Sequence, residues 1–238
     1  MHNKSMVLVV EDDADIAALL IQSLKQAGFE VCHSVSCHQA LVLARQQRFS
    51  LVTLDLSLPD GDGLDLCRHL KDLNPELAIL MVSARHSETD MIVGLELGAD
   101  DYISKPFSLR EFQARVRSLM RRVELLKNSS VNQPANMLRV GTLVIDKSTH
   151  RVVLEGAAID LTATEFELLE FLARQPYRVF SRSQLLASVW GYQHSGYEHT
   201  VNSHINRLRN KLEKDPAQPK IVETIWGVGY RFNPETVA

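Results

Sequence analysis

Two apolar runs of the sequence each end in acidic residues. Met6–Val10 is followed by Glu11 and Asp12, and Leu51–Leu54 is followed by Asp55. A carboxylate at the end of a rigid strand can act as a nucleophile toward phosphorus, although an aspartate that merely caps a turn has the same appearance in isolation. Three carboxylates held close together repel unless a cation neutralises them, and hard oxygen ligands suit Mg²⁺. The pattern therefore predicts phosphoryl transfer to Asp55 with Mg²⁺ as cofactor.

Two further runs end in groups that could bind a phosphoryl group. Ser83 follows the apolar run Leu77–Val82, and Lys105 follows Asp101–Ser104. A hydroxyl and an ammonium can hold the remaining phosphoryl oxygens. Singly, Ser83 would be a loop residue and Lys105 a solvated one, so only their joint placement with the carboxylates indicates a site.

The elements that must position these residues alternate regularly. The expected strands are Met6–Val10, Phe29–His33, Leu51–Leu54, Leu77–Val82 and Asp101–Ser104. Apolar residues recur at helical spacing in 16–24, 40–44, 64–73, 91–97 and 112–123. Five such units predict a (βα)5 doubly wound parallel sheet of the flavodoxin/CheY type, with right-handed crossovers. The carboxyl ends of parallel strands share one edge, so the polar residues should converge there.

These strand ends and their residues resemble the receiver domain of two-component response regulators, over residues 6 to about 124. The resemblance implies that Asp55 accepts a phosphoryl group from a phosphohistidine of a cognate sensor histidine kinase, and that Lys105–Pro106 is cis. It implies the metal ligands Glu11, Asp12, Asp55 and Ser57, the last through its backbone carbonyl. It implies the phosphate-binding and switch residues Ser83, Ala84, Tyr102 and Lys105. Ser83 would then move to bond the phosphate, and Tyr102 would follow inward.

In the resembling subfamily, the face made by the fourth helix, fifth strand and fifth helix dimerises through salt bridges. The candidate residues on that face are Glu96, Asp100, Asp101, Glu111, Arg115 and Arg122. Met91 stands where relatives often carry a basic partner for the acid at Glu111. We therefore expect one bridge to be missing, and Met91→Arg to tighten phosphorylated dimers.

The second half of the chain begins after a polar stretch without apolar periodicity. We expect a receiver domain over residues 1–125, a flexible linker over 126–137 and an effector domain over 138–238. Short strands are expected within 138–145, 151–154 and 158–159. Two capping boxes, Thr162–Glu165 and Ser181–Gln184, open helices. A third helix from about Thr200 to Leu212 has one apolar stripe opposite amides, hydroxyls and arginines, which are groups that read base edges or hold phosphates.

This third helix, together with a terminal hairpin around Gly227–Arg231, resembles the winged-helix effector domain of OmpR/PhoB-type regulators, over about residues 138–233. The resemblance implies an α+β domain with a leading four-stranded antiparallel sheet, a recognition helix in the major groove and a wing at the minor groove. It implies DNA contacts from His199, Thr200, Asn202, Ser203, His204, Asn206, Arg207, Arg209, Lys211, Thr224, Trp226 and Arg231. His199, Asn202 and Trp226 replace charged residues common in relatives, which predicts weaker phosphate anchoring and a shallower salt slope. Trp226 could instead stack against sugar edges.

Composition limits the class of protein. Residues 1–127 carry 14 Lys+Arg against 18 Asp+Glu, and residues 128–238 carry 12 against 11, so neither half has the strong positive charge often seen in nucleic-acid-binding domains. Three cysteines form no disulfide framework, which suits a reducing cytosol. The first residues are too short an apolar run for a signal peptide, and no run is long enough to span a membrane, so we expect a cytoplasmic protein without a membrane partner.

The sequence thus predicts a phosphorylation-dependent transcription regulator, a phosphoacceptor and not a turnover enzyme, that binds repeated promoter half-sites as a homodimer, with RNA polymerase as a candidate further partner. Three alternatives can be compared with this prediction. A phosphatase of the haloacid-dehalogenase type would want a second aspartate at position 57, which is Ser57. A DNA-binding regulator independent of phosphate would not need the complete acidic site. A nucleotide-binding module would need a Gly-rich loop after the first strand, which the sequence lacks.

Overall fold

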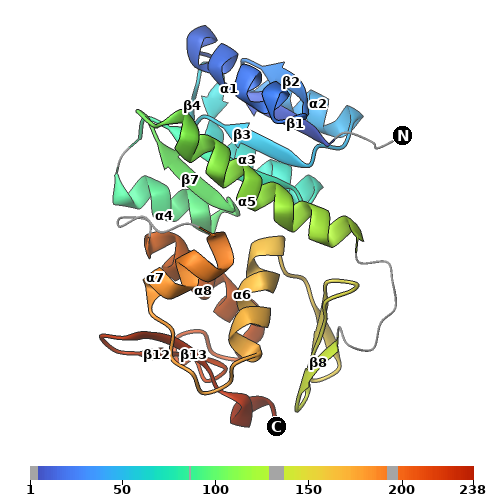
Figure 1. Cartoon of the computed structure of the whole chain (residues 1–238), viewed down its shortest axis with the longest axis vertical. Coiled ribbons are helices and arrows are strands. Elements are labelled where there is room, and N and C mark those ends of the chain that lie inside the picture. Colours follow the sequence, from blue (N-terminus) through green and yellow to red (C-terminus); the bar gives the residue numbers. More distant parts are fainter. Residues whose placement is uncertain (1–4, 86, 129–136, 192–197) are drawn as a thin grey trace. The chain divides into compact units, whose positions relative to one another are not determined.

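A computed structural model of the chain describes residues 5–85, 87–128, 137–191 and 198–238 (Figure 1). It divides into two compact units, one up to Arg121 and the other from Arg122 onward. Within the described residues, no helix combines the length and the apolar character needed to cross a membrane.

The first unit is built on a five-stranded parallel sheet in the order β2-β1-β3-β6-β7. Its strands are β1 (Met6–Val10), β2 (Glu30–Ser34), β3 (Leu51–Leu54), β6 (Ala78–Ser83) and β7 (Asp101–Ser104). The helices that follow these strands are α1 (Ala14–Gln26), α2 (Cys37–Gln46), α3 (Gly63–Leu73), α4 (Glu88–Glu96) and α5 (Leu109–Asn128), whose last residues, from Arg122, fall in the second unit. The central strands β1, β3 and β6 are nearly continuous runs of buried residues, as strands covered by helices on both faces must be.

The two faces of this sheet are covered by different helices. One core cluster joins β1 and β3 residues such as Leu8 and Val52 to Ala40 of α2, Leu66 of α3 and Leu95 of α4. Helices α1 and α5 run together over the other face (Figure 1). A hydrogen bond from Gln113 of α5 to Ser23 of α1 links them. The predicted alternation of strands and helices is confirmed.

Three details differ from the sequence-based prediction. The turn after Asp55 contains a two-stranded hairpin of β4 (Ser57–Leu58) and β5 (Gly61–Asp62), because Pro59 and Asp60 allow the chain to reverse tightly. Helix α4 begins three residues earlier than the apolar spacing suggested, where Ser87 caps it. Helix α5 continues to Asn128, into the stretch expected to be a linker. The expected cis Lys105–Pro106 bond is present.

The second unit opens with a four-stranded antiparallel sheet in the order β11-β10-β9-β8. Its strands are β8 (Met137–Val140), β9 (Leu143–Asp146), β10 (Arg151–Leu154) and β11 (Ala157–Ile159). There follow α6 (Ala163–Ala173), α7 (Arg182–Leu185) continued by a π-helix (Leu186–Trp190), α8 (Glu198–Leu212), the hairpin β12 (Val222–Ile225) and β13 (Gly229–Phe232), and a 3-10 helix (Pro234–Val237). The expected winged helix with a leading sheet is confirmed.

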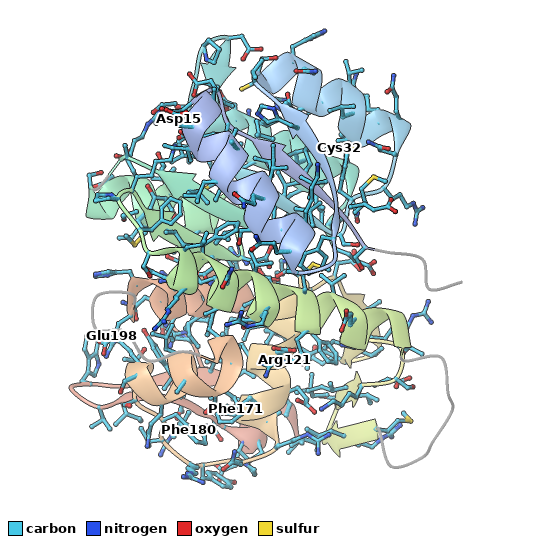
Figure 2. All side chains as sticks on the ribbon, turned by 45° about the horizontal axis from the view of Figure 1, so that its top comes forward. Asp15, Cys32, Arg121, Phe171, Phe180 and Glu198 are labelled. Carbon is cyan, nitrogen blue, oxygen red and sulfur yellow. The ribbon has the colours of Figure 1, made fainter. Side chains whose placement is uncertain are left out.

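Local signals account for much of this unit. The Thr162 and Ser181 side chains accept from the amides of Glu165 and Gln184, which bond back in two complete capping boxes. The Phe171 and Phe180 rings pack 4.9 Å apart between centroids (Figure 2). Phe180 also pairs with Tyr230 as an isolated β-bridge, which ties the hairpin to the helical core.

Candidate functional site

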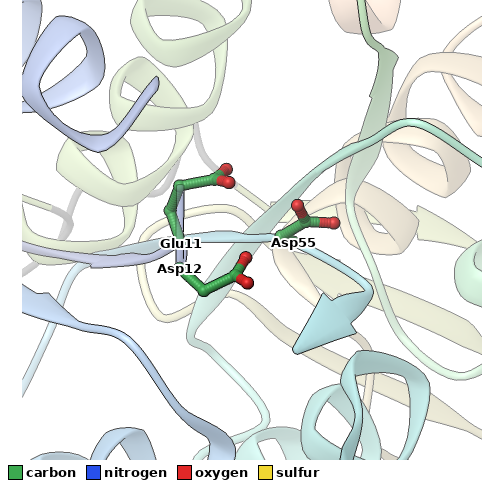
Figure 3. Close-up of side chains that lie close together, drawn as sticks. All are labelled: Glu11, Asp12 and Asp55. Carbon is green, nitrogen blue, oxygen red and sulfur yellow. The ribbon is translucent and has the colours of Figure 1, made fainter. Parts of the chain in front are cut away.

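Three carboxylates meet at the carboxyl edge of the parallel sheet (Figure 3). One oxygen from each of Glu11, Asp12 and Asp55 lies within 4.8 Å of the others. The register of the sheet explains this, because Val10 stands opposite Leu54 and the Asp55 amide donates to the Val10 carbonyl at 2.9 Å. Glu11 and Asp55 are buried, whereas Asp12 is exposed. Three hard oxygen donors in this space fit a divalent cation such as Mg²⁺.

The Lys105 side chain bridges two of these carboxylates. Its Nζ donates to both carboxylate oxygens of Glu11 at 2.8 Å and to Asp55 Oδ2 at 2.6 Å. Burial raises the pKa of Glu11 to about 7, although Lys105 acts to lower it. Burial also lowers the pKa of Lys105, but its hydrogen bonds to Asp55 and Glu11 outweigh burial and leave that pKa above its ordinary value. Lys105 therefore remains an ammonium that offsets negative charge beside Asp55.

Groups from β4 and the end of β6 lie at the same edge of the sheet as Asp55. The Ser57 amide donates to Asp55 Oδ1 at 3.0 Å. Ser83 is buried at the last position of β6, and its Oγ accepts from the Arg85 amide at 3.3 Å. Ala84 is exposed between them. The strand ends thus bring the expected residues to one edge of the sheet.

Tyr102 is already inside the first unit. Its ring belongs to the core cluster on the α2–α3–α4 face, and its hydroxyl donates to the Arg85 carbonyl at 2.5 Å. Burial raises the pKa of Tyr102 to about 12, so the phenol stays a neutral donor at physiological pH. Tyr102 is therefore already buried in the described conformation, and its movement on phosphorylation stays a prediction.

Helix α8 buries the apolar stripe that its spacing predicts, formed by Val201, Ile205, Leu208 and Leu212. Of the residues expected to contact DNA, Asn206 and Lys211 are exposed, and His199 and Asn202 are half-buried. The remaining ones on this helix are buried: Thr200, Ser203, His204, Arg207 and Arg209.

Two of these basic side chains share one carboxylate of α6. Glu165 Oε1 lies 2.8 Å from Arg207 Nε, and its Oε2 lies 2.7 Å from Lys211 Nζ. Burial alone would raise the pKa of Glu165, but the charges of Arg207 and Lys211 outweigh it and hold the pKa below its ordinary value. The sequence identified Glu165 only as a capping residue, whereas the fold also makes it the anchor of α8.

Other α8 side chains hold the hairpin in place. The Arg209 guanidinium donates to the Val222 carbonyl at 2.7 and 2.9 Å and to Thr224 Oγ1 at 2.7 Å. Asn202 Oδ1 accepts from the Tyr230 hydroxyl at 2.9 Å. In the hairpin itself, Arg231 pairs with Glu223 at 2.6 Å, and the Trp226 side chain is exposed. Away from the hairpin, His204 of α8 packs edge-on against Trp190, with ring centroids 5.0 Å apart.

Comparison with known proteins agrees with both units. Residues 7–117 match the family model of the response regulator receiver domain, and residues 156–232 match that of the C-terminal domain of transcriptional regulatory proteins. The DNA-binding response regulator MtrA of Mycolicibacterium smegmatis is 43% identical over 231 residues, which cover 97% of this chain and 98% of MtrA. The chain belongs to the OmpR/PhoB family of response regulators.

Two further relatives each cover 97% of this response regulator. The transcriptional regulatory protein ResD of Bacillus subtilis is 38% identical over 232 residues, covering 97% of this chain and 96% of ResD. DrrB of Thermotoga maritima, an OmpR/PhoB homologue with a crystal structure, is 32% identical in sequence. Its structure superposes with a TM-score of 0.51 over 97% of this chain and 99% of DrrB. The organisation into receiver and effector units is therefore shared along the full chain.

Sequence reasoning missed two residues in the loops at the carboxyl edge of the sheet. Arg85 Nη1 lies 3.4 Å from the Asp62 carboxylate, and Nη2 donates to the Leu56 carbonyl at 3.3 Å. Asp60 accepts from the Cys37 and His38 amides at 2.7 and 2.9 Å, which caps α2 from a distant loop. Arg85 could have been noticed from its place two residues after a strand-end serine, but the Asp60 contact has no local signal.

Ion pairs already join several residues of the expected dimer face within the chain. Arg115 lies 2.9 Å from Asp101 and 2.8 Å from Glu111. Asp100 lies 2.8 Å from Lys71 and accepts from a backbone amide of β6. Glu96 is exposed, and the Arg122 side chain lies outside the described residues. Intersubunit bridges from Asp101, Glu111 or Arg115 would therefore require an exchange of partners.

Met91 is part of the receiver core. It is 9% exposed and packs in the cluster that contains Leu95 and Tyr102. This burial argues against the expectation that Met91→Arg would tighten dimers, because arginine at this position would bring a charge into an apolar cluster. We expect Met91→Arg to lower the urea midpoint of the receiver unit, measured by circular dichroism, whereas Met91→Leu should leave it nearly unchanged. Equal midpoints for the two variants would contradict this assignment.

Proposed function

We propose that Asp55 accepts a phosphoryl group from a phosphohistidine of a cognate sensor histidine kinase, and that this modification controls binding to promoter DNA. The observation that carries the proposal is the contact of Lys105 Nζ with Asp55 Oδ2 at 2.6 Å, beside the clustered carboxylates of Glu11 and Asp12. In the transfer, an Asp55 carboxylate oxygen bonds to phosphorus, the N–P bond of the donor breaks, and its electron pair stays on the imidazole. The chain mainly positions these groups.

The remaining residues of the edge would hold the transferred group. Glu11, Asp12 and Asp55, with the backbone carbonyl of Ser57, would hold Mg²⁺, which would supply positive charge to phosphoryl oxygens. Lys105 would hold a second oxygen. Ser83 and the neighbouring Ala84 would bind a third, and Tyr102 would keep its inward position next to them.

Asp12 gives a test of the metal site with little effect on folding. Because Asp12 is exposed, we expect Asp12→Ala to keep the stability of the receiver unit. We expect it to lower Mg²⁺ affinity by at least about tenfold, since losing a residue that only orients a metal ligand already costs that much. Isothermal titration calorimetry with MgCl2 measures the affinity. Asp15→Ala, at an exposed position in the first turn of α1, is the matched control. Equal affinities for the two variants would argue against the proposed ligand set.

We propose that the effector unit binds DNA through α8 and the β12–β13 hairpin. MtrA, which matches the whole chain, is described as a DNA-binding response regulator. The polar side of α8 offers Asn206 and Lys211 to a partner, with His199 and Asn202 half-exposed beside them. Amide side chains read base edges and ammonium groups bind phosphates. The regulator would act in the cytoplasm, and RNA polymerase would be a further partner at the promoter.

Phosphorylation would favour a homodimer through α4, β7 and α5. The ion pairs of Arg115 with Asp101 and Glu111 lie on this face, and the switch residue Tyr102 belongs to its central strand. Dimerisation would exchange intrachain ion pairs for intersubunit ones. Two linked effector units then bind repeated half-sites with higher affinity, because the second contact is made at a high effective concentration.

Footprinting on the DNA upstream of the chain's own gene tests this proposal. We expect protection of two repeated half-sites that strengthens when the protein is treated with acetyl phosphate and Mg²⁺. Protection unaffected by phosphodonor would instead favour a regulator that works without phosphate. Sustained release of phosphate from a phosphomonoester would favour the phosphatase alternative.

A further inference from the structure

The tip of the β12–β13 hairpin is an uncharged apolar projection. Trp226 is 90% exposed and Val228 is 53% exposed. Gly227 between them has φ +75°, and the Val228 amide closes the turn on the Ile225 carbonyl at 2.9 Å. Residues 225–229 carry no charged side chain. A large indole held in water gains free energy when a partner covers it, in proportion to the apolar area removed from solvent.

The base of the hairpin is fixed to α8. Arg209 reaches from α8 to Val222 and Thr224 on β12, two residues before Trp226. On β13, the Tyr230 hydroxyl donates to Asn202 of α8. The Arg182 guanidinium from α7 also donates to Asn202 Oδ1 at 2.8 Å and lies 5.2 Å from the Tyr230 ring centroid. These contacts hold the tip at a set offset from the polar side of α8.

The position of the hairpin tip beside α8 indicates which part of a DNA duplex the tip would meet. A helix that reads base edges lies in the major groove, because only that groove admits it. An element fixed beside the helix then crosses the phosphate backbone toward the adjacent minor groove. Apolar side chains that enter a minor groove act as wedges against base steps and sugars.

Resting on the proposed function, we propose that Trp226, supported by Val228, is an apolar wedge in the DNA minor groove. Such a wedge selects sites by how easily they deform, and flexible pyrimidine–purine steps deform more easily than stiff A-tracts. Trp226 would then help to determine which DNA sequences are bound, through an uncharged side chain. This role differs from that of a basic wing residue, which would anchor to phosphates.

The chain provides its own fluorescent probe for this contact. It has two tryptophans, and Trp190 is fully buried while Trp226 is exposed. The probe DNA is a duplex enriched from a random pool by the wild-type, phosphodonor-treated protein. We expect this duplex to shield Trp226 from acrylamide and to shift its emission, and the Trp226→Phe variant to show neither change. The emission of Trp190 in that variant reports that the fold is intact.

Measurements of DNA affinity at several salt concentrations distinguish an apolar wedge at Trp226 from a residue that binds phosphates. We expect Trp226→Ala to weaken binding of the enriched duplex roughly tenfold, as removing an aromatic contact to DNA does. The slope of log affinity against log salt should stay the same, whereas Trp226→Arg should steepen it by about one. Met137→Ala, which removes another exposed apolar side chain from the same unit, should bind like wild type.

Each failure has a distinct meaning. If the pool yields no enriched duplex, the proposed DNA-binding function fails. If a duplex is enriched but Trp226→Ala binds it equally and acrylamide still reaches Trp226, the wedge is wrong and the proposed function stands. If Trp226 becomes shielded with rising protein concentration in the absence of DNA, the tip is an interface with a second copy, and the wedge is again overturned.

Discussion

Replacing Asp55 by asparagine should reduce phosphoryl incorporation from acetyl phosphate and Mg²⁺ to background. The amide keeps the size of the side chain but lacks the anionic oxygen that bonds to phosphorus. The substitution also removes one of the three clustered carboxylates and one of the two acidic partners of Lys105. Intact-mass spectrometry of the folded protein, with and without hydroxylamine, measures the labile adduct directly.

Asp65→Asn is the matched control for this experiment. Asp65 lies on α3 with 67% of its side chain exposed and pairs only loosely with Arg68 at 3.2 Å, so its loss should change nothing. A hydroxylamine-labile adduct that persists in Asp55→Asn would place the acceptor on another carboxylate. Loss of the adduct in both variants would point to a general effect of charge and not to Asp55 itself.

The Glu165→Gln variant should lower the free energy of unfolding of the effector unit by about 3 kcal/mol, the loss typical when one member of a buried ion pair is removed. Glutamine can still complete the capping box, as Gln184 does in the second one. The variant therefore isolates the loss of the carboxylate that pairs with Arg207 and Lys211. Urea unfolding followed by tryptophan fluorescence reports this unit alone, because both tryptophans belong to it.

The effect of Glu165 should depend on pH with a definite sign. Its pKa is lower in the folded than in the unfolded chain, so its contribution is fully present above the ordinary pKa of a carboxyl. It is lost as the pH falls through the lowered folded value. The stability difference between wild type and Glu165→Gln should therefore be largest at neutral pH and shrink in acid.

Glu155→Gln provides the control for both measurements. It removes an ion pair with Lys214 whose side chains are 52% and 86% exposed, and exposed pairs of this kind contribute little to stability. A small loss in Glu165→Gln, equal to that in the control, would mean that the Glu165 pairs are as weak as surface ones.

Much of the receiver could be predicted because its signals are local. Strands β1, β3 and β6 are short apolar runs that stop at polar residues, β7 is a short run before Lys105–Pro106, and parallel pairing brings the ends of these strands together. The placement of Glu11, Asp55 and Lys105 at one edge follows from these two facts. The same holds for the two capping boxes of the effector unit, where four adjacent residues carry the whole signal.

Contacts between distant segments could not be predicted in this way. Periodicity placed Arg207 on the polar side of α8, yet Lys211 and Arg207 both reach Glu165, and the first of these pairs spans 46 positions. Met91 stands where relatives often carry a basic residue, but in this chain it packs in the receiver core.

By itself, the sequence of this protein determined the order of its strands and helices, and it placed the candidate phosphoacceptor Asp55 and the charged groups around it at the ends of strands. Only the tertiary structure decided which polar side chains are used within the chain and which face outward, as Trp226 does. The reason is physical: a side chain's own neighbours set its local conformation, whereas its charge partners and its exposure depend on segments that meet only when the chain packs.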